Sequence, residues 1–234
     1  MPGPFAARFL EGARRDPVVI AVDEPVEEAA RILGGIPGPL NLKVGWAPLL
    51  RAGVGAISAA KDLARGGLVI ADVKIADVPH VSGAIARELA DAGADGVIVH
   101  GFPGPDVVAE VIRSAHGAGV LVVVEMSNPG ALLCYQGCAE RLAEVARDAG
   151  ADGIVAPATR PDRISALRRV VGDGMIVVAP GVGAQGGSAY EAVLAGADAV
   201  IVGRSITSSK DPMGSLSRIR DEALRGLRLR LGSR

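Results

Sequence analysis

The sequence has few cysteines, few aromatic residues and no long apolar run. Only two of its 234 residues are cysteine, and 3% are aromatic. Cys134 and Cys138 lack the second pair of ligands that a zinc site needs, and thiols stay reduced in the cytosol. We interpret them as small apolar residues, which would share one helix face if their segment is helical, with a redox role as the alternative. No apolar run approaches the roughly 20 residues of a membrane span, and the N-terminus lacks a signal-peptide core, so we expect a cytoplasmic protein with no membrane partner.

Neither positive nor negative charge is in excess. The formal net charge is −1 and the chain has no long basic block, which argues against a nucleic-acid partner and favours a small-molecule one. Lysine itself is scarce: of 25 basic residues only four are lysine. Two of these, Lys43 and Lys74, fall at the ends of expected strands. Because lysine can give up a proton far more readily than arginine, this placement favours a chemical role for both.

Short β-rich runs alternate with longer amphipathic segments along the whole chain. Each run is nearly all apolar, as expected of parallel strands covered on both faces. The expected strands are 18–22, 40–44, 68–73, 96–100, 120–126, 153–157, 175–180 and 199–203. No linker divides these eight βα units, so we predict an α/β fold with one domain over 1–234, a (β/α)₈ TIM barrel. An open doubly wound sheet is the alternative.

An internal repeat supports this pattern. The segments DAGADGVIV, DAGADGIV and LAGADAVIV precede or include the fourth, sixth and eighth expected strands. In each, Ala-Gly ends a helix, where glycine can adopt a left-handed cap, and Ala-Asp leads into the strand. Repeated units of this kind favour the closed barrel.

Polar residues cluster at the carboxyl ends of the expected strands, where barrels carry their active sites. They are Asp23, Lys43, Asp72, Lys74, Asp77, His100, Ser127 and Arg204. In ADVKIADVP, Asp72 and Lys74 are two residues apart, so their side chains share one face of the strand, and Asp77 lies in the next loop. A neighbouring carboxylate keeps a buried ammonium charged, which makes Lys74 a candidate proton donor. An ion-pair network that only stabilises the barrel is the alternative.

A glycine-rich segment, APGVGAQGGS, follows the seventh strand, and VGRS follows the eighth. Loops at these two places often bind phosphate in barrels, since small residues let backbone amides approach an anion. The candidate phosphate ligands are Pro180, Gly181, Val182, Gly183, Gln185, Gly203 and Arg204. The glycines could instead serve steric needs alone. The segment GVGAQG also matches a dinucleotide-binding fingerprint, but only one strand follows it, too few for that fold.

Taken together, the motifs resemble the orotidine 5′-phosphate decarboxylase family, most closely its compact archaeal-type members. The matching segments, in chain order, are AVD (21–23), LKVG (42–45), D-x-K-x-x-D (72–77), VHGFPG (99–104), MSNPGA (126–131), PGVGAQGG (180–187) and VGRSI (202–206). The resemblance implies a barrel, usually dimeric, that converts orotidine 5′-phosphate to UMP and carbon dioxide in pyrimidine biosynthesis. It implies neither a metal nor an organic cofactor.

The resemblance also implies roles for the charged residues. Lys74 would protonate C6 of the pyrimidine as carbon dioxide leaves, and Asp72 would lie against the substrate carboxylate. Lys43 would complete a network of alternating lysine and aspartate charges. Asp77 would reach the active site of the neighbouring subunit, so that the sites of a homodimer lie at its interface. Asp23 would bind a ribose hydroxyl.

The remaining family positions concern the base and the phosphate. Ser127 would contact the pyrimidine, and Gln185, Gly203 and Arg204 would bind the phosphate. Val81 departs from the family pattern, in which a threonine often helps to bind ribose. We expect His100 to be a hydrogen-bonded structural residue.

Two other functions stay open on the sequence. Related barrels with D-x-K-x-x-D act on ketose phosphates as magnesium-dependent lyases or decarboxylases, although MSNPGA argues against them. A non-catalytic sugar-phosphate-binding barrel would keep the phosphate loops, but would not need Asp72 and Lys74.

Overall fold

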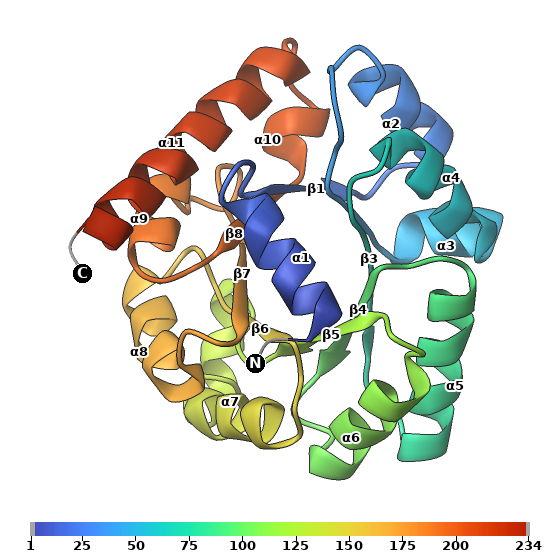
Figure 1. Cartoon of the computed structure of the whole chain (residues 1–234), viewed down its shortest axis with the longest axis vertical. Helices are drawn as coiled ribbons and strands as arrows, with labels where there is room; N and C mark the ends of the chain where they lie inside the picture. Colours follow the sequence, from blue (N-terminus) through green and yellow to red (C-terminus); the bar gives the residue numbers. More distant parts are fainter. Residues whose placement is uncertain (1–2, 233–234) are drawn as a thin grey trace.

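The computed structural model, which describes residues 3–232, is a closed barrel of parallel strands ringed by helices (Figure 1). Its strands are β1 Val18–Val22, β2 Leu42–Val44, β3 Val69–Ile75, β4 Gly96–His100, β5 Gly119–Val123, β6 Gly153–Val155, β7 Ile176–Pro180 and β8 Ala199–Val202. They pair in chain order, and β8 closes on β1 with Val18 opposite Val200. The predicted (β/α)₈ barrel is confirmed, and closure excludes the open doubly wound sheet.

The helices are α1 Pro4–Ala13, α2 Val26–Leu33, α3 Trp46–Ala52, α4 Gly55–Ala64, α5 Pro79–Asp91, α6 Pro105–Ser114, the 3₁₀ helix η1 Pro129–Leu133, α7 Ala139–Asp148, α8 Pro161–Val171, α9 Ala189–Leu194, α10 Arg204–Thr207 and α11 Pro212–Gly232. Helices α2 to α9 return the chain from one strand to the next, whereas α1 precedes β1 and both α10 and α11 follow β8. Within residues 3–232 no helix has the length and apolar character needed to cross a membrane.

The apolar strands are buried on both faces. On β1, Val18 and Ile20 pack in the layer between the sheet and the helices, whereas Val19 and Ala21 belong to the cluster inside the barrel. Each strand therefore needs apolar side chains at nearly every position, which explains the continuous runs in the sequence.

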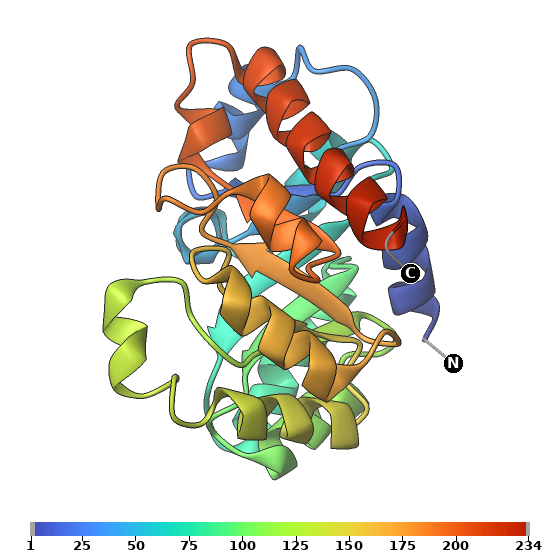
Figure 2. The same ribbon diagram turned by 90° about the vertical axis from the view of Figure 1, so that its left-hand side faces the viewer.

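Helix α1 closes the amino-terminal end of the barrel. Phe5 and Phe9 are buried in the interior cluster, and α1 crosses that end in Figure 1. A Cβ atom on Gly119 would lie only 1.9 Å from the Phe5 ring, so glycine is required at the start of β5. Figure 2 shows α1 at one end of the molecule and the yellow-green turn of η1 protruding at the other. The carboxyl ends of the strands thus remain open.

The internal repeat has a structural explanation. Gly93, Gly150 and Gly196 all have positive φ, as expected of left-handed helix ends. The aspartate that follows each of them accepts a hydrogen bond from the first or second amide of the preceding strand: Val69 N donates to Asp95 (2.7 Å), Val120 N to Asp152 (2.9 Å) and Val177 N to Asp198 (2.9 Å). The repeat therefore satisfies strand amides at the closed end of the barrel.

The fifth strand is shorter than predicted. Our expected strand extended to Met126, but β5 ends at Val123. The amides of Val124 and Glu125 both point to the same carbonyl of Val155, at 3.3 and 3.4 Å, so the regular ladder stops there. The residues from Val124 onward instead form a loop over the open end of the barrel.

Candidate active site

A cavity of about 850 Å³ lies at the carboxyl ends of the strands. Most of the predicted site residues line it: Asp23, Lys43, Asp72, Lys74, Ser127, Pro180, Gly181, Val182, Gln185, Gly203 and Arg204. Residues from all eight strands or the loops that follow them converge here, as in barrel enzymes. Two predicted residues, Asp77 and Gly183, are not among the lining residues.

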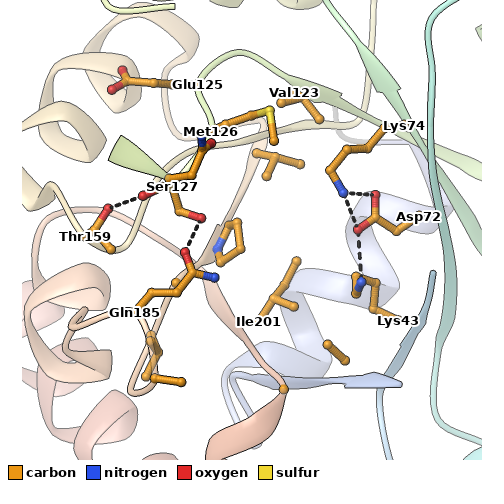
Figure 3. A pocket seen from close by; sticks show the side chains of 18 of the residues that line it. Lys43, Asp72, Lys74, Val123, Glu125, Met126, Ser127, Thr159, Gln185 and Ile201 are labelled. Atoms are coloured by element: carbon orange, nitrogen blue, oxygen red, sulfur yellow. Dashed lines mark hydrogen bonds and ion pairs between the residues drawn. The ribbon is translucent and has the colours of Figure 1, made fainter. Parts of the chain in front are cut away.

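The centre of the cavity wall is a chain of alternating charges (Figure 3). The Lys74 ammonium donates to both carboxylate oxygens of Asp72, each at 2.9 Å. The Lys43 ammonium lies 3.1 Å from Asp72 Oδ2 and 3.3 Å from Asp23 Oδ1. One buried carboxylate therefore holds two lysines.

The electrostatics of this chain keep its buried members charged. Burial alone would lower the pKa of Lys43, but the charges of Asp72 and Asp23 outweigh it and the pKa is raised. Burial alone would raise the pKa of Asp72, yet Lys43 and Lys74 bring it below its usual value. Both groups are ionised at neutral pH, so the site combines a fixed carboxylate with fixed ammonium groups.

The backbone at Lys74 is unusual for a strand. Its φ of 47° is in the left-handed region, and the pairing of β3 with β4 shifts between Ala71 and Ile75. The predicted contact between Asp72 and Lys74 is confirmed, but it occurs at an irregular part of the strand rather than in a regular pleat. A non-glycine residue in this conformation costs about 1–3 kcal/mol, and such strain concentrates at functional sites.

The glycine-rich loop after β7 is shaped by close approaches. Gly181 (φ 109°) and Gly183 (φ 73°) both have positive φ. A Cβ atom on Gly183 would lie 2.1 Å from the Ser205 hydroxyl, which accepts a hydrogen bond from Ala184 N. Gly183 thus lets the loop pack against α10, and it is not among the residues that line the cavity. Arg204, the first residue of α10, is exposed and lines the cavity.

Two loops that we predicted to bind different parts of a ligand contact each other. The Ser127 hydroxyl donates to Gln185 Oε1 at 2.8 Å (Figure 3), and the Thr159 hydroxyl donates to the Ser127 carbonyl at 3.1 Å. With its oxygen occupied, the Gln185 amide can present its NH₂ group as a donor. The expected base and phosphate contacts are therefore joined by one side-chain bridge.

Asp77 lies outside this cavity. Its carboxylate accepts a hydrogen bond from Val78 N at 2.7 Å, and its side chain is exposed just before α5. The Ser82 hydroxyl donates to the Asp77 carbonyl at 2.8 Å and fixes the turn. Val81 is half-buried on α5 and also does not line the cavity. Within one chain, the structure does not bring Asp77 to Lys74.

His100 has the structural environment that we expected. Its Nδ1 is 2.8 Å from the Tyr135 hydroxyl, and burial, followed by the charge of Lys74, lowers its pKa to about 4.

Tyr135 comes from the loop that carries both cysteines. That segment is not an α-helix, because η1 ends at Leu133 and α7 begins at Ala139, so the shared helix face of Cys134 and Cys138 does not exist. The Cys138 thiol instead lies 3.2 Å from the Cys134 carbonyl.

Sequence reasoning missed several residues of the cavity wall. The unpredicted polar ones are Glu125, Asn128, Thr159 and Arg160. Glu125 and Arg160 both follow apolar strand runs, so the rule that identified Lys74 could have found them. Glu125 lies inside the expected strand 120–126, and Arg160 lies three residues beyond the expected strand 153–157. Among residues 3–232, no group of three His, Cys, Asp or Glu side chains is arranged to hold a metal ion.

Comparison with known proteins shows the family of this chain. The model of the Orotidine 5'-phosphate decarboxylase / HUMPS family matches residues 16–219. The chain belongs to this family. The family predicted from the motifs is therefore confirmed.

Curated relatives from archaea cover nearly the whole chain. The orotidine 5′-phosphate decarboxylase of Methanococcoides burtonii is 41% identical over 213 residues, which span 89% of this chain and 98% of that protein. The enzyme of Methanosarcina mazei is 43% identical over 205 residues, 86% of this chain and 92% of that protein. These names confirm the predicted enzyme class, a decarboxylase.

Solved structures of the family superpose well. Orotidine 5′-monophosphate decarboxylase of Methanocaldococcus jannaschii, complexed with the inhibitor BMP, has a TM-score of 0.83 at 34% identity and covers 89% of this chain and 99% of that chain. The enzyme of Pyrococcus horikoshii has a TM-score of 0.79 at 41% identity, covering 88% and 98%.

Proposed function

We propose that this protein converts orotidine 5′-phosphate to UMP and carbon dioxide, with Lys74 as the proton donor to C6. The observation that carries the proposal is the Lys43–Asp72–Lys74 contact in the cavity wall, with the Lys74 ammonium 2.9 Å from both Asp72 oxygens. A structural ion pair needs no access to a ligand, whereas these three residues line an open cavity. The names of the relatives give the substrate.

The chemistry requires a cation at one defined atom. When the C6–carboxylate bond breaks, its electron pair stays on C6, where the pyrimidine ring delocalises it poorly. An ammonium group fixed nearby stabilises this charge as it develops. A proton then moves from Lys74 Nζ to C6, and the neutral amine takes up a proton from solvent.

Asp72 would orient this donor. Because its two oxygens both accept from Lys74, the ammonium is held in one position before the substrate binds. The second lysine, Lys43, compensates the buried charge of Asp72, and it also contacts Asp23, the proposed ligand of a ribose hydroxyl. Asp72 would then lie beside the substrate carboxylate.

The rest of the cavity suits a nucleotide. Arg204, Gly203 and the loop 180–185 would bind the phosphate, since a guanidinium can form two hydrogen bonds to it. Ser127 would contact the pyrimidine, and Gln185 would connect the two ends through its bond to Ser127. A nucleotide pathway within the cell favours a cytoplasmic location.

A homodimer would explain the position of Asp77. Its exposed carboxylate lies outside the cavity of its own chain, as expected if it serves the site of a second subunit. Inactive Asp77→Ala and Lys74→Ala proteins should then regain activity when mixed under subunit exchange, because a mixed dimer contains one site with both native residues. Exchange without recovered activity would contradict a shared site.

The direct test is the loss of orotidine 5′-phosphate absorbance in the presence of EDTA. We expect full activity with EDTA, because two ammonium groups already neutralise Asp72 and would compete with a divalent cation. Activity only with magnesium, on a ketose phosphate, would favour the metal-dependent members of the barrel group. Binding of both compounds without turnover would favour a non-catalytic protein.

A further inference from the structure

One side of the cavity wall carries a second ion cluster that the proposed chemistry does not use. Glu125 is fully buried, with its side chain 1% exposed. Its Oε1 accepts from Arg160 Nε and its Oε2 from Arg163 Nε, both at 2.9 Å. Figure 3 shows the Glu125 carboxylate turned away from Lys74, on the other side of the cavity.

The cluster continues to the surface. Arg163 donates through Nη1 and Nη2 to the two oxygens of Glu140, at 2.8 and 3.0 Å. The hydrogen bond from Arg163 lowers the pKa of Glu140. The 44% exposed side chain of Glu140 forms the outer end, whereas Glu125 forms the inner end. The two acids should therefore differ in importance.

The inner end is connected directly to the cavity. Arg160 lines it, and besides Glu125 it donates to the carbonyl of Met126. Met126 precedes Ser127, whose carbonyl is held by Thr159 and whose hydroxyl reaches Gln185. The base end of the cavity, defined here as Met126, Ser127 and Arg160, is thus held on the segment that follows β5, beyond the last regular strand pairing.

A buried carboxylate is a costly way to stabilise a loop. Two charges withdrawn from water cost several kcal/mol each, and apolar side chains of similar volume would often stabilise as well. However, a carboxylate that is hydrogen-bonded to two guanidinium groups, as Glu125 is, can hold one wall of the cavity in place to within a fraction of an ångström. The cost is reasonable if the position of the wall matters to a ligand.

We propose that Glu125 is a positioning residue for the base end of the cavity: it holds Arg160 and the Met126–Ser127 segment where the pyrimidine binds. The inference rests on the proposed function. It assigns Glu125 to recognition of the base rather than of the phosphate, whose expected ligands lie on the loops after β7 and β8.

Two ligands separate these contributions. UMP occupies both ends of the cavity, and ribose 5-phosphate only the phosphate and ribose parts. We expect Glu125→Gln, which keeps the shape but removes the charge, to weaken UMP binding by about tenfold or more in calorimetry. Ribose 5-phosphate should bind within about twofold of the native protein. The value of kcat/KM for orotidine 5′-phosphate should fall by about 10²-fold, as for a small misplacement of a catalytic wall.

Matched variants keep the test decisive. Glu140→Gln removes an acid from the same cluster at its outer end and should leave both affinities and turnover unchanged. If Glu125→Gln does not fold, Arg163→Met leaves the Arg160–Glu125 pair and should produce a smaller loss of the same kind. A thermal melt accompanies each variant.

The outcomes distinguish the two proposals. A Glu125→Gln protein with a lowered melting temperature and unchanged UMP affinity would overturn the positioning role and leave the proposed function intact. A native protein that binds UMP no more tightly than ribose 5-phosphate, and does not decarboxylate, would overturn both.

Discussion

The two ends of the barrel use the same charged residue types for different purposes. At the closed end, the carboxylates of Asp95, Asp152 and Asp198 accept hydrogen bonds from strand amides. At the open end, Asp72 accepts from two lysine side chains in the wall of a cavity. A backbone amide cannot turn to a ligand, whereas an ammonium at a cavity wall can give its proton to one. The closed end should therefore determine stability, and the open end activity.

The largest expected effect is at the open end. Lys74→Ala should lower kcat/KM by at least about 10⁴-fold, because it removes both the acid and the charge opposite the nascent carbanion. The melting temperature should change little, because the Lys74 side chain is partly exposed and its backbone conformation is strained. The matched control is Lys61→Ala, which breaks the 2.7 Å contact with Asp95 at the closed end and should keep native turnover. A Lys74→Ala protein that is active but destabilised would show that Lys43, Asp72 and Lys74 form only a structural ion-pair network.

The opposite result is expected at the closed end. Phe5→Ala leaves a cavity inside the barrel, where the ring packs against Gly119, and should lower the free energy of unfolding by about 3–5 kcal/mol. Denaturant titration measures this loss. The folded fraction should retain native kcat, because α1 lies at the far end from Lys74. A kcat that falls with stability would show that the two ends are coupled.

A smaller effect concerns the phosphate. Arg204→Ala removes a guanidinium from the cavity and should raise KM by about 10- to 100-fold, the range for hydrogen bonds to a charged group. Since Arg204 is exposed, the melting temperature should stay near the native value. Steady-state kinetics with orotidine 5′-phosphate provide the measurement. Unchanged KM and kcat would remove Arg204 from the site.

The smallest effect is a pH dependence from His100. Its pKa of about 4 in the folded protein lies below its ordinary value of 6.5, so the unfolded chain binds more protons between these values. His100 therefore contributes fully to stability above pH 6.5, and this contribution decreases as the pH falls toward 4. We expect a loss of about 1 kcal/mol between pH 7 and 5.5. Urea titrations should show a shallower pH slope for His100→Asn than for His116→Asn, which alters an exposed histidine.

The sequence predicted regular features better than local exceptions. Continuous apolar runs predicted the strands, because every strand of a barrel is covered on both faces. The same run led us to extend the fifth strand to Met126, since periodicity cannot show that Val124 and Glu125 share one carbonyl. Glu125 was missed for this reason, although a charge at the end of an apolar run was the signal that identified Asp72 and Lys74.

The sequence by itself determined the barrel, the family and most of the residues that line the cavity. All of these depend on residue type and order along the chain. Only the tertiary structure decided which side chains meet. It joins Ser127 to Gln185 and pairs the buried Glu125 with two arginines from another loop and helix. It also places Asp77 outside the cavity. Closure of the barrel fixes these distances, because it brings eight strand ends to one rim, and no local pattern in the sequence contains that geometry.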